Sequence, residues 1–151
     1  MSQIPVVYND AYDIRVPPTH RFNGTKFSKL VYHLQRSDFS KQLDFIHSSP
    51  VRYEDIKRAH ANDYVQRVAT GALLREEVRQ INLPINTQLI KRSFLALNGT
   101  YKTALKALQT GVACHAAGGT HHAHYSYGSG FCVFNDLAFT ALNMIKHVLV
   151  E

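Results

Sequence analysis

The chain of 151 residues is long enough for one domain with a buried core, and its apolar fraction of 45% and charged fraction of 19% exclude a disordered chain. Its net charge of +6 comes from 17 basic and 11 acidic residues, but the basic residues are scattered without interleaved aromatic residues, which argues against a nucleic-acid partner. No run approaches the length of a membrane span and the N-terminus lacks a secretory pattern, so we expect a soluble protein without a membrane partner, cytoplasmic or alternatively nuclear.

Two short apolar runs near the N-terminus predict strands. The first is residues 4–8 (IPVVY), which ends at Asn9-Asp10, and the second is residues 43–46 (LDFI), which is followed by a Ser-Ser-Pro turn. Between them, after an Asn23-Gly24 turn, apolar residues recur at helical spacing at Phe27, Leu30, Val31 and Leu34. The first third of the chain therefore predicts a strand, a helix and a second strand.

The middle of the chain predicts short helices. Residues 53–60 favour one helix, and Asn62 or Asp63 is expected to cap another that ends at Gly71. For His60 and Tyr64, a structural role is favoured over a functional one. Residues 73–84 combine Arg and Glu charges with INLP and predict no defined element.

The second half predicts two amphipathic helices on either side of a third strand. Thr87 is expected to cap the longest helix, which ends at Thr110-Gly111, and Arg92 lies off its packing stripe. That stripe consists of Ile90, Phe94, Leu97, Tyr101, Ala104, Leu105 and Leu108. The third strand covers residues 112–114, and the last helix begins near Asn135 or Asp136. Its shared apolar face consists of Leu137, Ala141, Ile145 and Leu149. Short strands alternating with amphipathic helices predict an α/β fold with a parallel sheet covered on both faces.

The segment between the third strand and the last helix carries the candidate chemistry. It passes through Gly118-Gly119 into His121-His122 and continues through Gly128-Ser129-Gly130-Phe131. Glycines permit a positive φ, and adjacent imidazoles supply general acid and base groups near neutral pH. One alternative is a plain solvated loop. Another is a small metal-binding site formed by Cys114, His115, His121, His122 and Cys132, although these spacings fit no usual zinc pattern.

The order of residues in this segment adds a resemblance. GGTHHA, followed by GSGFCVFND and an apolar helix, resembles the signature of the zinc-dependent histone deacetylase and acetylpolyamine amidohydrolase superfamily, most of all its class IV and bacterial members. The resemblance implies a three-layer, parallel-sheet deacetylase fold of the arginase-like type. Residues 1–151 would form only the N-terminal half of that domain, with an incomplete sheet.

The resemblance also implies roles for individual residues. His121 and His122 would be the catalytic acid/base pair, with His122 as the main general base and His121 stabilising charge. Gly130 and Phe131 would line the narrow channel that accepts an acetylated lysine or an acetylated small amine. Arg21, which follows His20 after the first strand, would lie near the inner end of the active-site cavity.

The expected metal ligands are absent from the sequence. In the superfamily the zinc ligands begin in an Asp-x-Asp-x-His arrangement on the strand after the last helix predicted here, and this chain contains no Asp-x-His. We therefore expect zinc in the complete family domain but no metal ligands, no bound zinc and no deacetylase activity in this chain alone. A complementing second chain or self-association would cover its exposed edges. The alternative is a non-catalytic interaction module with vestigial histidines.

Overall fold

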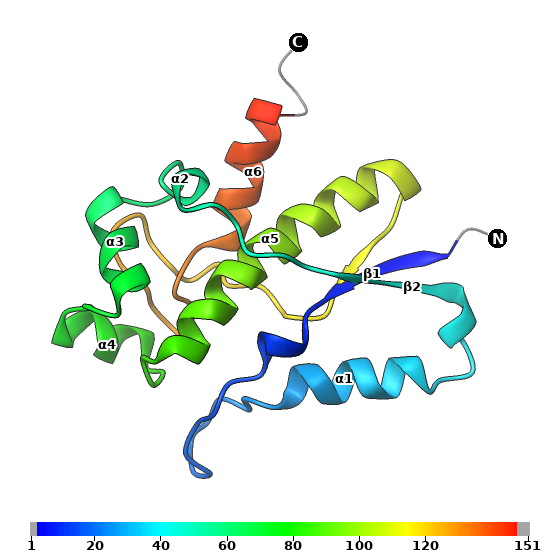
Figure 1. Ribbon diagram of the computed structural model, residues 1–151, viewed down its shortest axis with the longest axis horizontal. Coiled ribbons are helices and arrows are strands. Elements are labelled where there is room, and N and C mark those ends of the chain that lie inside the picture. The colour runs from blue at the N-terminus through cyan, green and yellow to red at the C-terminus, as the bar shows by residue number, and fades with distance from the viewer. Residues whose placement is uncertain (1–2, 148–151) are drawn as a thin grey trace.

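Strand β1 (Ile4–Tyr8) forms the centre of a three-stranded parallel sheet in the computed structural model, which describes residues 3–147 (Figure 1). It pairs with β2 (Leu43–His47) on one side and with β3 (Cys114–His115) on the other, so that Val6 lies opposite both Phe45 and Cys114. The first two predicted strands are confirmed. The third predicted strand, residues 112–114, starts too early, because in this segment only Cys114 and His115 pair with β1.

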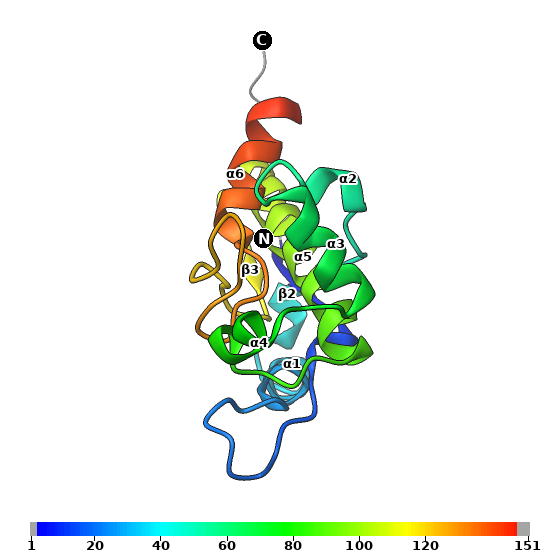
Figure 2. The same ribbon diagram turned by 90° about the vertical axis from the view of Figure 1, so that its left-hand side faces the viewer.

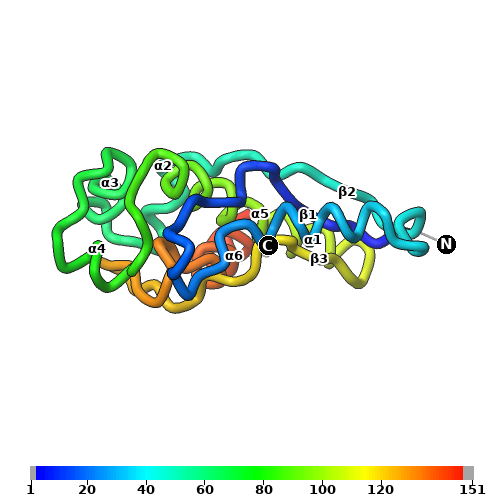
Figure 3. The backbone as a smooth tube through the Cα atoms, turned by 90° about the horizontal axis from the view of Figure 1, so that it is seen from below, coloured from blue at the N-terminus to red at the C-terminus, as the bar shows by residue number. Residues whose placement is uncertain are grey.

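Helices cover both faces of this sheet, as predicted. Helix α1 (Lys26–Gln35) lies against one face, where its Val31 packs in a small core with Val6 and Ala116 (Figure 3). Helix α5 (Thr87–Thr110) lies against β1 on the other face, and α6 (Asp136–His147) packs beside α5. None of the helices in the described part of the chain is long and apolar enough to cross a bilayer.

The remaining elements lie beyond the carboxyl ends of the strands (Figures 1 and 2). They are the short helices α2 (Tyr53–Ile56), α3 (Asn62–Thr70) and α4 (Arg75–Ile81). Together with α5 and α6 they enclose the largest core, which contains Tyr64, Ile81 and Phe134. One 3₁₀ turn, η1 (Asp10–Tyr12), follows β1, and a second, η2 (Ser40–Gln42), precedes β2. The segment from β3 to α6 runs beside α3 and α4, at the end of the sheet where parallel-sheet proteins place their sites.

Several predicted helix boundaries are wrong for local reasons. The helix predicted to reach His60 ends at Ile56, because the chain continues in turns, in which the amides of Arg58 and Ala59 donate to the carbonyls three residues before them. Helix α3 starts without a side-chain cap, because the residue before it is Ala61, and Asn62 and Asp63, the predicted caps, lie inside the helix; it ends at Gly71 as predicted.

Two further differences concern α4 and the start of α5. Asn86, not Thr87, caps α5, because its side-chain oxygen accepts from the Leu89 amide at 2.9 Å. Helix α4 occupies the stretch for which no element was predicted, and the Glu77 carboxylate accepts from the Leu74 amide at its start.

The predicted packing faces of the two long helices differ from the buried ones. On α5, Leu108 is 61% exposed, whereas Arg92, expected off the stripe, is 3% exposed. On α6, Leu137 and Ile145 are 56% and 54% exposed, and Leu149 lies outside the described residues. The side of α6 that contacts α5 instead carries Phe139, whose ring lies 6.3 Å from that of Tyr101. Leu137 and Ile145 of the predicted apolar face therefore stay uncovered in the described part of the chain.

Candidate active site

The loop between β3 and α6 borders a cavity of about 390 Å³ at the carboxyl end of the sheet. The segment after β1 forms its other wall. The cavity brings together all five residues predicted for the site, namely Arg21, His121, His122, Gly130 and Phe131. These residues are up to 110 positions apart in the sequence, so the fold rather than local order creates the cluster.

The tandem histidines lie side by side on the exposed rim of this cavity. Their ring centroids are 4.2 Å apart, with the planes tilted by 45°. Gly130 lies directly against His122: it has a φ of +54°, and a Cβ there would approach the His122 Cβ to 3.4 Å. A larger residue at position 130 would therefore be strained by its positive φ, and its Cβ would lie in contact with His122.

Asn135 fixes the backbone on both sides of His122. Its Nδ2 donates to the carbonyls of His121 and Ala123 at 3.1 and 2.9 Å. The same side chain caps α6, because its Oδ1 accepts from the Ala138 amide at 3.0 Å. Asn135 therefore contributes both to the start of the helix and to the placement of the histidine pair.

His60 supports this arrangement from the core. It is fully buried, and its Nε2 accepts from the Asn135 amide at 2.9 Å, so the proton is on Nδ1, which donates to the Tyr125 carbonyl at 3.2 Å. Burial lowers the pKa of this imidazole and keeps it neutral. Tyr64, also fully buried, donates to the Val133 carbonyl at 2.7 Å. Both contacts agree with the structural roles predicted for His60 and Tyr64.

Phe131 is held in an uncommon backbone conformation between two aromatic rings. Its φ is +69°, a region that few residues other than glycine adopt, and its ring lies 5.7 Å from His20 and 5.5 Å from Phe22. The amides of Gly130 and Phe131 donate to the carbonyls of Gln80 and Ile81 at the end of α4. No side-chain pattern indicates this anchor, because its acceptors are backbone carbonyls in the stretch for which the pattern assigned no element.

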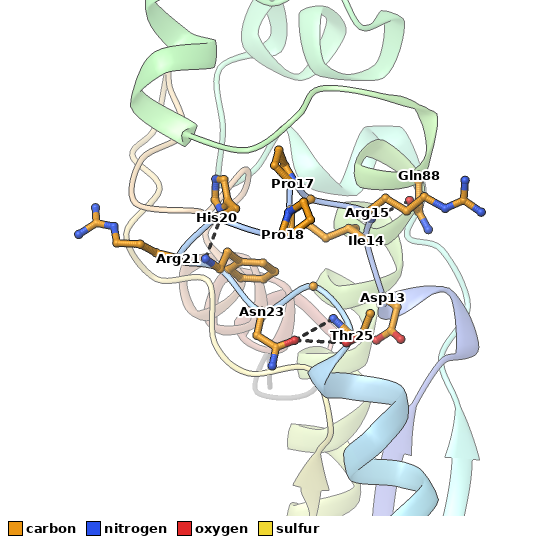
Figure 4. Close-up of a pocket in the computed structure, with 13 residues that line it drawn as sticks. Asp13, Ile14, Arg15, Pro17, Pro18, His20, Arg21, Asn23, Thr25 and Gln88 are labelled. Carbon is orange, nitrogen blue, oxygen red and sulfur yellow. Dashed lines mark hydrogen bonds between the residues drawn. The ribbon is translucent and has the colours of Figure 1, made fainter.

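Arg21 lies at the boundary between this cavity and a second one of about 740 Å³, formed by residues 13–18, residues 20–25 and Gln88 (Figure 4). In Figure 4 its guanidinium points away from the two prolines and from Asp13. The neighbouring His20 closes the segment onto α4, since its Nδ1 accepts from the Phe22 amide and its Nε2 donates to the Asn82 carbonyl, each at 3.0 Å.

The buried arginine of the cavity is Arg92, which sequence analysis missed. Its Nε donates to the Tyr12 carbonyl at 2.8 Å, and its guanidinium lies over the Phe27 ring at 4.7 Å. Burial lowers its pKa. A helix pattern assigns a charged residue to solvent, so no signal in the sequence places this one in the core.

The described residues do not by themselves form a zinc site. Between residues 3 and 147, no three His, Cys, Asp or Glu side chains come together in a way that would hold a metal ion. Asp136, the carboxylate nearest to the histidines in sequence, is buried and already accepts hydrogen bonds from Thr100 and Thr120.

The family is established by comparison. The model of the histone deacetylase domain matches residues 20–150. The chain therefore belongs to the histone deacetylase family, and the resemblance inferred from the histidine and Gly-Phe-Cys motifs is confirmed.

Individual relatives show how much of the family domain the chain represents. It is 39% identical over 148 residues to an uncharacterized protein of Picosynechococcus sp., covering 97% of this chain and 49% of that protein. It is 27% identical over 139 residues to human histone deacetylase 1, covering 85% of this chain and 28% of that enzyme. The chain thus spans half or less of the length of these relatives.

A solved structure supports the same fold. The crystal structure of the HDA15 HD domain superposes with a TM-score of 0.72 at 17% sequence identity, covering 93% of this chain and 42% of that one. The predicted fold class, the N-terminal part of a parallel-sheet deacetylase fold, is therefore confirmed.

Proposed function

We propose that this chain provides the acid/base and channel residues of a deacetylase domain, which hydrolyses the amide bond of an acetyl-lysine or an acetylated small amine. The observation that supports this most strongly is the single cavity bordered by His121, His122, Gly130 and Phe131 at the carboxyl ends of the strands. The two imidazoles and the aromatic wall match the needs of such a reaction, which moves protons at one end of a narrow apolar channel.

In this proposal the residues have separate roles. His122 takes a proton from the attacking water and returns it to the leaving amine, and His121 stabilises the charge that develops beside it. Phe131 packs along the alkyl stem of the substrate, while Gly130 leaves the space for that stem. Arg21 contributes a positive charge at the boundary of the cavity.

Zinc is part of the proposal for the complete domain. Deacetylases of this family are generally zinc-dependent, and we propose that the ligands come from a segment outside this chain. The absence of a suitable cluster between residues 3 and 147 motivates that view. The chain alone is accordingly proposed to be inactive.

A complementing segment would also cover apolar surface. Leu137, Leu142 and Ile145 of α6 are all exposed, and among the described residues β3 pairs on one side only. Such a face and a free strand edge favour association with another polypeptide or with a second copy. The same observation favours the second candidate function, a non-catalytic interaction module.

The experiment that tests the proposal is complementation. The part of the Picosynechococcus relative that this chain does not match is produced as a separate polypeptide and mixed with this chain and zinc. Turnover of an acetyl-lysine peptide or an acetylated polyamine only in the mixture supports the deacetylase proposal. A stable complex without turnover supports the interaction module, and turnover by the chain alone contradicts the need for a second segment.

A further inference from the structure

A buried chain of hydrogen bonds runs from α6 to the residues that follow β1, behind the histidine loop. Asp136, 1% exposed, accepts from the Thr120 amide through Oδ1 and from the Thr100 hydroxyl through Oδ2, each at 2.8 Å. The Thr100 oxygen lies 3.1 Å from Nδ1 of His115. Nε2 of His115 lies 2.8 Å from the Tyr12 hydroxyl. This series of hydrogen bonds connects His115 and Thr120, the two ends of the segment that leads from β3 to the histidine pair.

The carboxylate fixes the direction of every hydrogen bond in this chain. An ionised carboxylate only accepts, so the single Thr100 hydrogen points to Asp136 and the Thr100 oxygen must accept from Nδ1–H of His115. Burial lowers the pKa of His115 to about 4, so the ring carries only that one proton near neutral pH. Its Nε2 therefore accepts the single Tyr12 hydrogen, and Ser48 Oγ, 2.9 Å from the Tyr12 oxygen, donates to it in turn.

We propose that Asp136 is the positioning residue of the histidine loop: one oxygen anchors Thr120 next to His121, and the other holds His115 as the Nδ1–H tautomer bound to Tyr12. The inference rests on the proposed function for its catalytic meaning, because the loop so positioned carries the proposed acid/base pair. It concerns the backbone and tautomer of this chain, and both can be measured without turnover.

The shape of α5 is adapted to this contact. Gly99 lies in the interior of the helix, where glycine is less stable than alanine. A Cβ at this position would overlap both Nε2 of His115 and the Tyr12 hydroxyl. Gly99 therefore leaves room for the contact between His115 and Tyr12, although it lowers the helix propensity of α5.

The variant Asp136→Asn tests the direction assigned to these hydrogen bonds. To satisfy Thr120, the new amide must keep its oxygen toward that N–H and turn its NH₂ group toward Thr100. The Thr100 oxygen then accepts from Asn, its hydrogen turns to Nδ1 of His115, and the ring must carry its proton on Nε2. Thr120, Thr100 and His115 all keep a hydrogen bond, the displaced Tyr12 hydrogen turns to Ser48 Oγ at 2.9 Å, and only the second N–H of the new amide gains no acceptor, so the variant is expected to fold.

The tautomer is measured by two-bond ¹H–¹⁵N correlation spectra of the labelled 151-residue chain at pH 7. We expect His115 as the Nδ1–H form in the wild type and as the Nε2–H form in Asp136→Asn. An Nε2–H or doubly protonated His115 in the wild type, or the same tautomer in both proteins, would overturn the inference.

A second pair of variants separates the two oxygens of Asp136. Thr100→Val removes only the hydroxyl, so we expect the Thr120 amide to keep its protection from solvent exchange while His115 loses its single tautomer. Asp136→Ala removes the acceptor of Thr120, and we expect that amide to exchange at least about tenfold faster. Unchanged exchange in Asp136→Ala, or fast exchange in Thr100→Val, contradicts the assignment.

These outcomes are independent of the deacetylase proposal. A chain that never turns over an acetylated substrate can still show the tautomer change, which would leave the positioning role intact and remove its catalytic meaning. Conversely, an active complemented enzyme with an unchanged tautomer would refute only the role of Asp136.

Discussion

The side-chain amide of Asn135 donates a hydrogen bond to the backbone carbonyl of His121 at 3.1 Å. Asn135 also immediately precedes α6, and its side-chain oxygen caps that helix. Asn135 and Asp136 therefore hold the histidine loop together: Asn135 binds the backbone on both sides of His122, and Asp136 binds the amide of Thr120, which precedes His121.

Replacement of Asn135 should separate capping from loop placement. Asn135→Asp keeps an oxygen for the Ala138 amide but loses both donors to the loop, whereas Asn135→Ala loses all of these contacts. We expect Asn135→Ala to lower the free energy of unfolding by about 1–2 kcal/mol. Asn135→Asp should also lower it, because a carboxylate oxygen would then face the carbonyls of His121 and Ala123. In both variants, the amides around His122 should exchange faster. Urea unfolding and hydrogen exchange measure the two effects. Wild-type exchange rates in Asn135→Asp would contradict the claim that the side-chain donors of Asn135 hold the loop.

Gly99→Ala should destabilise the chain although alanine is the better helix former. The helix-propensity gain of about 1 kcal/mol is opposed by overpacking against His115 and Tyr12, which typically costs about 1–3 kcal/mol or more when backbone must shift. Gln109→Ala, at an exposed position of the same helix, is the control and should be neutral or slightly stabilising. The midpoint of urea unfolding reports the difference. A higher midpoint for Gly99→Ala would mean that the contact between His115 and Tyr12 is looser than described.

Stability should fall on mild acidification. Burial lowers the pKa of His115 to about 4 and also lowers that of His60, so the unfolded chain binds more protons than the folded one between roughly pH 6.5 and pH 4. The stabilisation is complete above pH 6.5 and is lost as the pH falls toward 4, by up to about 3 kcal/mol for His115. Urea unfolding at several pH values measures this slope. His115→Gln should reduce the slope, and His33→Gln, at an exposed position, should not.

The exposed face of α6 should govern association. Leu137→Glu combined with Ile145→Glu places charges on two apolar positions that are more than half exposed, and we expect complexes that bury this face to weaken at least about tenfold. Leu30→Glu, on the exposed side of α1, is the matched control. Sedimentation or size-exclusion profiles over a concentration series measure the effect. If the α1 variant weakened association as much as the α6 variant, the α6 face would not be the contact.

Local patterns in the sequence predicted the elements that are themselves local. The run IPVVY gave β1 with the observed bounds, and the motif with two histidines and Gly-Phe-Cys gave residues that the structure gathers around one cavity. The failures concern distant partners. Nothing in a helical pattern indicates that Arg92 is buried against Phe27, because that contact depends on how α1 packs. Likewise, amphipathicity identifies the apolar face of α6 but not whether another segment covers it.

The supporting contacts of the site were the least predictable part. The carbonyls of Gln80 and Ile81 hold the channel residues through backbone atoms, which leave no trace in side-chain patterns. The roles of Thr100 and His115 depend on hydrogen bonds that lead to Asp136, directly from Thr100 and through Thr100 from His115, and Asp136 lies more than 20 residues away from either.

The most direct test of the central claim is the rate of deacetylation in the complemented mixture, with matched histidine variants. His122→Ala removes the proposed base, and His124→Ala removes a histidine of the same loop that stacks on Tyr127. With zinc, an acetyl-lysine peptide and a saturating complementary segment, we predict a rate loss of about 10²–10⁴-fold for His122→Ala and a near-wild-type rate for His124→Ala. An active mixture in which His122→Ala retains the wild-type rate would contradict the proposed catalytic role of the histidine pair.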